Sequence, residues 1–142
     1  MNNGLEVNIR LTDQKVHFTG VSETNPERPV EFDFQPPLGE GQGYKGLELL
    51  LMSFAGCVST TIVYLLRSKA KDVSGFKMNA KGITSLQPLA LQRICFEAVL
   101  ESRDADDSDI ENAIGLAGEA APVWKAIKNN VEVSPGYRVI RV

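Results

Sequence analysis

The sequence predicts an α+β fold in which antiparallel strands surround one long apolar helix. Two observations carry this prediction: the apolar run at residues 47–67, and the order of segments around it. Alternating apolar and polar residues precede the run, and further alternating segments and a second helical pattern follow it. The chain has 142 residues, of which 43% are hydrophobic, enough for one core. We therefore expect a single domain over residues 1–142.

The first third of the chain predicts three antiparallel strands. Residues 5–11 alternate between apolar and polar side chains, as a half-buried strand does. A second strand is predicted over residues 16–18 and a third over residues 30–34, after the turn-forming Asn25-Pro26. Pro36-Pro37 and the glycines of residues 39–43 then predict a mobile loop that leads into the helix.

The apolar run predicts a helix that is buried on all sides, because its apolar residues are spread around the whole circumference. Ser53, Gly56 and Thr60 recur at helical spacing and form a small-residue face that another backbone can approach closely. A transmembrane span is the competing interpretation, because the run is roughly 20 residues long. Glu48 and several hydroxyl residues dilute the run, and a membrane anchor does not explain the strand patterns on both sides. We therefore favour a buried helix in a soluble domain.

The second half of the chain alternates strands with a helix. Strands are predicted over residues 76–80 and 91–100, and one face of the latter is apolar. A capping box from Ser108 to Glu111 predicts a helix that runs to about Ala121, and Pro122 then starts a short second helix. The final residues predict a closing hairpin, with strands at 131–133 and 137–142 and a turn at 134–136.

Composition excludes several classes of function. The net charge of -3 comes without a basic cluster, so we expect no nucleic-acid partner and no binding to an anionic membrane. Met1 is followed by polar residues rather than by a secretory signal. Two cysteines form neither a disulfide framework nor a metal-ligand set, and we expect no cofactor and no metal. A cytoplasmic location fits these features best.

Cys57 is the residue whose setting most invites chemistry. It follows Gly56 and lies among hydroxyl residues, where a thiolate can accept hydrogen bonds and a substrate meets little bulk. The alternative interpretation is that Cys57 is a small buried hydrophobic residue. We expect Cys95 to contribute to packing rather than to chemistry. His17 is the only histidine, and a lone strand histidine is a weak partner for a cysteine.

Glu48 lies at the start of the predicted helix, where the helix dipole favours a carboxylate. At about 100° per residue, Glu48 and Cys57 fall on roughly opposite faces of an unbroken helix. A direct partnership between them requires either a later helix start or a second subunit.

Residues 48–57, Glu-Leu-Leu-Leu-Met-Ser-Phe-Ala-Gly-Cys, resemble the signature of the OsmC/Ohr family, the osmotically induced and organic hydroperoxide resistance proteins. Ala121-Pro122-Val123 and residues 130–133 resemble the second half of the family in order and spacing. The resemblance implies an intertwined α+β homodimer with active sites at the subunit interface. In peroxidase members the first cysteine attacks the O–O bond of a hydroperoxide, and a second cysteine resolves the sulfenic acid as a disulfide. An arginine and a glutamate hold the first cysteine as thiolate.

Carried onto this sequence, the resemblance assigns the nucleophile to Cys57. The place of the second cysteine is occupied by Ala121, and the glutamate of the peroxidase branches corresponds to Leu47, next to Glu48. Arg10 lies near the first turn, where the family's arginine tends to lie. We thus expect Cys57, Glu48 and Arg10 as catalytic residues, with an external thiol as reductant of a single-cysteine peroxidase. The alternative is non-catalytic binding of a small apolar or electrophilic ligand at the dimer interface.

Overall fold

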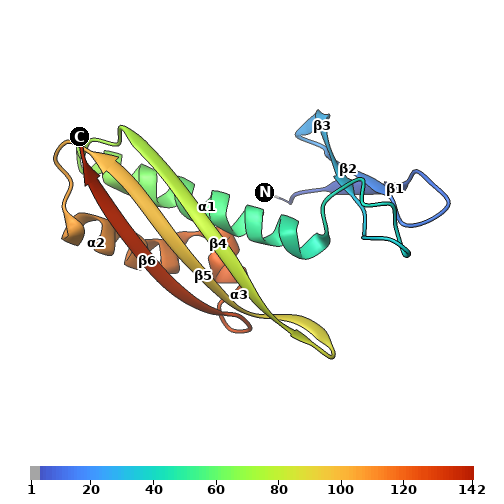
Figure 1. The fold of residues 1–142 in the computed structure, drawn as a ribbon. Helices are drawn as coiled ribbons and strands as arrows, with labels where there is room; N and C mark the ends of the chain where they lie inside the picture. Colours follow the sequence, from blue (N-terminus) through green and yellow to red (C-terminus); the bar gives the residue numbers. More distant parts are fainter. Residues whose placement is uncertain (1–3) are drawn as a thin grey trace. The chain divides into compact units, whose positions relative to one another are not determined.

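The computed structural model describes residues 4–142, which fall into two compact units: an N-terminal unit that ends at Leu49 and a C-terminal unit over Leu50–Val142. The predicted α+β class is confirmed (Figure 1). In chain order the elements are β1 (Val7–Leu11), β2 (Phe18–Ser22), β3 (Asn25–Phe32), α1 (Gly46–Ser68), β4 (Gly75–Leu86), β5 (Leu89–Ser102), α2 (Asp107–Ala120), α3 (Pro122–Ile127) and β6 (Glu132–Arg141).

The N-terminal unit is the predicted antiparallel meander, with strand order β1-β2-β3. Two boundaries differ from the prediction: β2 begins at Phe18, and β3 begins at Asn25, so that Asn25-Pro26 lie in the strand and the turn falls at residues 23–24. Proline is tolerated there because β3 is an edge strand, whose outward N–H groups make no ladder bonds.

The apolar side chains of β1 lie uncovered within the chain, so the prediction of a half-buried strand is wrong for a single copy. Val7, Ile9 and Leu11 are 66%, 52% and 50% exposed, although all three lie on one face of the strand. Soluble proteins rarely leave such a continuous apolar face open.

The loop between β3 and α1 is organised around a buried carboxylate, which the alternating pattern had placed on the wet face of its strand. Asp33 is only 4% exposed. Its carboxylate accepts hydrogen bonds from the backbone N–H groups of Phe34, Glu40 and Gln42 at 2.8, 3.2 and 3.0 Å. Gly39 is required here, because a Cβ would lie 2.2 Å from Asp33 Oδ1. The loop residues therefore fold onto Asp33.

The C-terminal unit contains a sheet with strand order β4-β5-β6, in which β4 and β5 are antiparallel and β5 and β6 are parallel. The predicted hairpin over residues 131–142 is wrong, because residues 132–141 form one continuous edge strand. Pro135 pairs with Phe96 inside this strand, and the edge position makes its missing N–H harmless. A parallel pair needs a crossover connection, which α2 and α3 supply.

The core of the C-terminal unit lies between the sheet and its helices. The face of β5 that carries Ile94, Phe96, Ala98 and Leu100 is buried, as predicted, and it packs against α1, α2 and α3 (Figure 1). The start of α2 differs slightly from the prediction: the capping box joins Asp106 and Asp109 instead of Ser108 and Glu111. The restart at Pro122 is confirmed.

Within this chain α1 is buried along one stripe, not on all sides as the sequence pattern predicts. Phe54, Val58, Ile62 and Leu66 recur every four residues and are the buried members of the helix. Tyr64 is 69% exposed. By length and composition α1 is apolar enough to cross a membrane, a test that core helices also pass. Its uncovered side, like β1, carries exposed apolar side chains.

Candidate active site

Cys57 lies near the middle of α1, beside the buried stripe. Its side chain is half-buried and packs against the core cluster from the edge of the stripe. On the neighbouring residue Gly56, an added Cβ would meet no atom within 4 Å beyond the helix's own backbone. The surface next to the thiol is therefore open within the C-terminal unit, which leaves room for a ligand or a second polypeptide.

The hydroxyl groups around Cys57 are largely committed to other bonds. Thr60 and Thr61 donate to the carbonyl oxygens of Gly56 and Cys57 at 2.8 and 3.0 Å. The hydroxyl of Ser59 faces the sulfur of Met78 at 3.7 Å. Within the described residues no hydrogen bond reaches the thiol of Cys57. The expectation that these hydroxyls donate to a thiolate is therefore wrong for a single copy, because helical threonines bond to the preceding turn.

Glu48 has a defined structural role at the start of α1. Its carboxylate accepts the backbone N–H of Lys45 at 2.8 Å, which is the reciprocal half of a capping box. The helix begins at Gly46, before Glu48, so the later start that would turn Glu48 toward Cys57 does not occur. Helix geometry therefore leaves a second subunit as the way for a Glu48 carboxylate to meet a Cys57 thiol.

Arg10 lies on β1 in the N-terminal unit, opposite Thr19 of β2, and it is exposed. It has no ion pair among residues 4–142, and its charge only adds to the lowering of the pKa of Glu31 by the hydrogen bonds of Thr19 and His17. Lys15, a cation of the turn after β1, pairs with Glu40 at 2.5 Å. Among the described residues, Arg10 is thus one of the cations without an ion pair that can approach a ligand or another chain.

Ala121, the position to which the resemblance assigns the second cysteine, is a packed methyl group. Ala121 is fully buried between α2 and α3, and its backbone N–H donates to the carbonyl of Ala117 at 2.8 Å. Cys95 lies on β5 and pairs with Lys81 of β4 and Ser134 of β6. Both cysteines are free in the structure.

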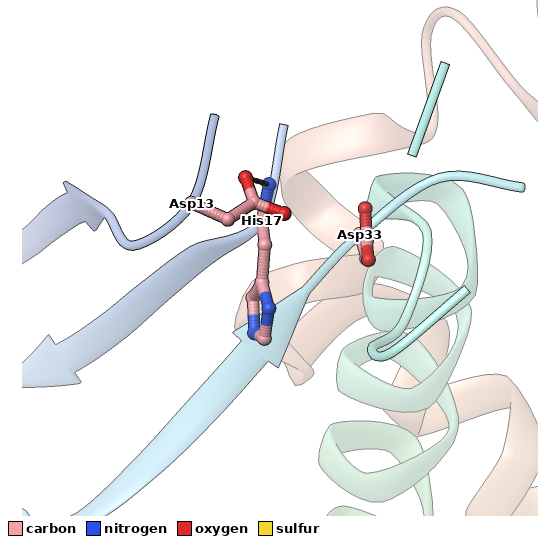
Figure 2. A group of neighbouring side chains, drawn as sticks. All are labelled: Asp13, His17 and Asp33. Carbon is pink, nitrogen blue, oxygen red and sulfur yellow. Dashed lines mark hydrogen bonds between the residues drawn. The ribbon is translucent and has the colours of Figure 1, made fainter. Parts of the chain in front are cut away.

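Sequence reasoning missed a polar cluster in the N-terminal unit. His17 Nε2 lies 2.8 Å from the Glu31 carboxylate, which also accepts the hydroxyl of Thr19 at 2.7 Å. The Thr19 hydroxyl, followed by His17, holds the pKa of Glu31 below its ordinary value. Asp33 and Asp13 lie close to the same histidine (Figure 2). The sequence offers only a weak hint of Asp33, a charged residue between two phenylalanines ahead of the proline- and glycine-containing loop.

Comparison with known proteins agrees with this architecture. A family model described as OsmC-like protein matches residues 39–135. No curated protein matches the chain. Among solved structures, an OsmC-like protein from Mycoplasma pneumoniae superposes with a TM-score of 0.83 at 17% identity, over 99% of both chains. A hypothetical protein from Aquifex aeolicus VF5 gives 0.84 at 20% identity, also over 99% of both chains.

A third similar structure is the organic hydroperoxide resistance protein OhrB of Bacillus subtilis. It has a TM-score of 0.64 and 17% identity, and the match covers 95% of this chain and 98% of that one. At this level of identity the likeness concerns the fold. The family match rests on the sequence region that contains Glu48, Cys57 and Ala121.

Proposed function

Because this chain belongs to the OsmC-like family, we propose that it is a thiol redox protein that reduces organic hydroperoxides through Cys57. The observation that carries the proposal is the position of Cys57, partly covered beside an open face of α1 within the segment that matches the family. The name of the Bacillus subtilis neighbour, an organic hydroperoxide resistance protein, supports the same class of substrate.

The proposed reaction has two stages. The Cys57 thiolate attacks the terminal oxygen of the hydroperoxide, so that an S–O bond forms, the O–O bond breaks, and the leaving alkoxide takes a proton to become an alcohol. The sulfenic acid then condenses with an external thiol and releases water. A second thiol attacks the mixed disulfide and regenerates Cys57. One hydroperoxide and two thiols thus yield an alcohol, water and a disulfide.

The proposal of an external thiol as reductant depends on the residue at position 121, which is alanine. A methyl group stands where the family's resolving cysteine is expected, and Cys95 lies on a different element, a β-strand. The chain therefore lacks the usual internal partner for the sulfenic acid. A reducing cytoplasm supplies small and protein thiols, which is why we propose that location.

We further propose that the working form is a homodimer whose interface completes the site. The uncovered apolar side chains of β1 and the open faces of α1 supply the surface. In a dimer, Arg10 and Glu48 from a second copy can approach Cys57, where the arginine stabilises the thiolate and the glutamate orients the arginine. This arrangement is compatible with the capping role of Glu48, since Lys45 N–H occupies only one of its oxygens.

The proposal is tested by mixing the purified protein with cumene hydroperoxide and following oxidation of each cysteine by mass spectrometry. We expect Cys57 to oxidise far faster than a free thiol, and Cys57→Ser to abolish turnover with an added dithiol. Cys95→Ser is the matched control and should retain activity, because Cys95 has no place in the reaction. Oxidation of Cys57 at the rate of a free thiol would exclude the proposed peroxidase activity.

The second candidate function is binding without turnover, and one feature favours it. The N-terminal unit has a cavity of about 290 Å³ with a mostly apolar lining that includes Val7, Ile9, Val30 and Phe32. A volume of this order suits a small apolar ligand. If Cys57→Ser binds such a ligand with unchanged affinity and keeps the cellular phenotype, binding is the function. If both are lost, the redox role is supported.

A further inference from the structure

Asp13, His17 and Asp33 bring three possible metal ligands together in the N-terminal unit. Each offers one atom, and these atoms lie within 4.8 Å of one another (Figure 2). They come from the turn after β1, from the residue before β2 and from the residue after β3. We propose that this cluster binds one divalent transition-metal ion and that the ion ties these three segments together. The proposal is independent of the redox role of Cys57.

The histidine is prepared for this role by a residue outside the cluster. Nε2 of His17 lies 2.8 Å from Oε1 of Glu31, and the hydroxyl of Thr19 donates to the same oxygen. When Nε2–H donates to the carboxylate, Nδ1 keeps its lone pair and becomes the ligand atom. A carboxylate on the far ring nitrogen is the usual support of a metal-binding histidine. Glu31 therefore fixes both the tautomer and the orientation of the ring.

Asp33 brings a charge that forms no direct ion pair among the described residues, although Lys15 and His17 lie within the reach of its charge. Its side chain is 4% exposed, yet it forms no ion pair within residues 4–142. Three backbone N–H groups hold the carboxylate, two at Oδ2 and only one, from Phe34, at Oδ1. Oδ1 thus retains acceptor capacity. Buried charges are generally paired or coordinate metals, and Asp33 has backbone N–H partners but no direct ion pair within residues 4–142.

Asp13 supplies the third ligand in the same manner. Its Oδ1 accepts the backbone N–H groups of Lys15 and His17 at 2.8 and 3.1 Å, which fixes the side chain. Oδ2 has no hydrogen bond in the described part of the chain. Lys15, two residues along the chain from Asp13, directs its ammonium group to Glu40. Two carboxylates without an ion pair therefore face one imidazole.

The donor set indicates the kind of ion. One imidazole nitrogen with two carboxylate oxygens suits Zn²⁺, Co²⁺ or Mn²⁺, with water in the remaining positions. The hydrogen bond to Glu40 is the main cause of the raised pKa of Lys15, and the charges of Asp13 and Asp33 add to it. Lys15 is therefore a positive charge near the cluster that opposes a bound cation. Removing the Lys15 charge should consequently tighten metal binding, whereas removing a ligand should weaken it.

The experiment is a calorimetric titration of the full chain with Co²⁺ and Zn²⁺ in a Cys57→Ser/Cys95→Ser background, which removes thiolate ligands. We expect one ion per chain and a higher melting temperature with metal. His17→Gln and Asp13→Asn should each weaken binding about 10- to 100-fold. Lys15→Met should strengthen it. Asp107→Asn, an acidic residue of α2 outside the cluster, is the matched control and should leave the affinity unchanged.

His17 is the only histidine, so its ring nitrogens give a direct second readout. In ¹⁵N spectra, Zn²⁺ should move the Nδ1 resonance and leave Nε2 protonated. The proposal is overturned if no ion binds at about 1 mM metal, or if His17→Gln binds as well as the parent. It is also overturned if both ring nitrogens stay protonated with metal present, which would identify an imidazolium that simply neutralises the carboxylates.

Discussion

At the scale of single residues, Glu48 and Asp33 show how similar carboxylates acquire different roles. Glu48 is exposed and caps α1 through Lys45 N–H, so its position follows from helix chemistry. Asp33 is buried and holds the loop that leads to α1 through three backbone N–H groups. The cap at Glu48 was readable from the sequence as a favourable helix start. The burial of Asp33 was not, because the strand pattern pointed it toward water.

The pKa of Asp33 leads to a prediction about acid stability. The N–H of Gln42, followed by those of Phe34 and Glu40, holds the pKa of Asp33 below its ordinary value of about 3.9. A carboxylate with a lowered folded-state pKa stabilises the fold above its unfolded pKa, and that stability is lost as the pH falls through the folded value. Asp33→Asn should therefore be less stable at pH 7 and show a shallower loss of stability between about pH 5 and pH 2.

Urea unfolding at a series of pH values measures this dependence. Asp107→Asn again serves as the control, because Asp107 is exposed and its carboxylate holds no loop by hydrogen bonds within residues 4–142. Equal pH slopes for Asp33→Asn and the parent protein would show that the carboxylate contributes no folded-state stability, and the structural role assigned to Asp33 would then be wrong.

At the scale of elements, the C-terminal unit shows where local patterns succeed and fail. The period-two burial of β5 and the restart of the helix at Pro122 were readable from the sequence. The hairpin predicted for residues 131–142 was not correct, since Ser134-Pro135-Gly136 carries a strong turn signal yet lies inside β6. Parallel pairing with β5 overrides that signal, and it is invisible to any local window.

The junction between α2 and α3 supports a prediction about how a sulfenic acid on Cys57 is resolved to a disulfide. If Ala121 stands in the place of a resolving cysteine, Ala121→Cys should allow a disulfide to Cys57 after peroxide treatment. The expected product is a protein that has lost two hydrogen masses and no longer needs a thiol to decay from the sulfenic state. Because Ala121 is fully buried, the added sulfur should cost roughly 1–3 kcal/mol of stability.

Non-reducing mass spectrometry after one equivalent of hydroperoxide provides the measurement. Ala120→Cys, one residue earlier and exposed, is the matched control and should form no such bond. A Cys57 sulfenic acid that persists in Ala121→Cys would show that position 121 does not reach the thiol, and that the family's resolving arrangement does not transfer to this chain.

At the scale of the whole molecule, the exposed apolar surface raises the question of whether the chain forms a dimer. Val7, Ile9 and Leu11 form one open face on β1, and Tyr64 leaves α1 exposed on the side away from the core. The expectation that α1 is buried on every side becomes compatible with the structure if a second copy provides the missing cover. Charge plays a minor part, since the chain's net charge is only -3.

This surface predicts a dimer that depends on Ile9. The parent protein should sediment at twice its chain mass of 15.5 kDa, and Ile9→Lys should shift it toward the monomer because it places a charge in an apolar interface. Asn8→Lys changes the adjacent residue on the opposite face of β1 and should leave the dimer intact.

Sedimentation velocity at several concentrations distinguishes these outcomes, and peroxidase assays on the same samples show whether activity follows dimer content. A parent protein that sediments as a monomer at all concentrations, or an Ile9→Lys variant that stays dimeric, would contradict the proposed interface. Activity retained by a true monomer would contradict the shared site while leaving the role of Cys57 intact.

The sequence by itself determined the α+β class, the span of α1, the apolar face of β5, and Cys57 as the candidate nucleophile. These features depend on the residue period and on short motifs, which local chemistry dictates. The parallel pairing of β6 with β5 and the meeting of Asp33 with Asp13 and His17 were decided only in the tertiary structure. They join residues far apart along the chain, and no local preference encodes which distant segments will become neighbours.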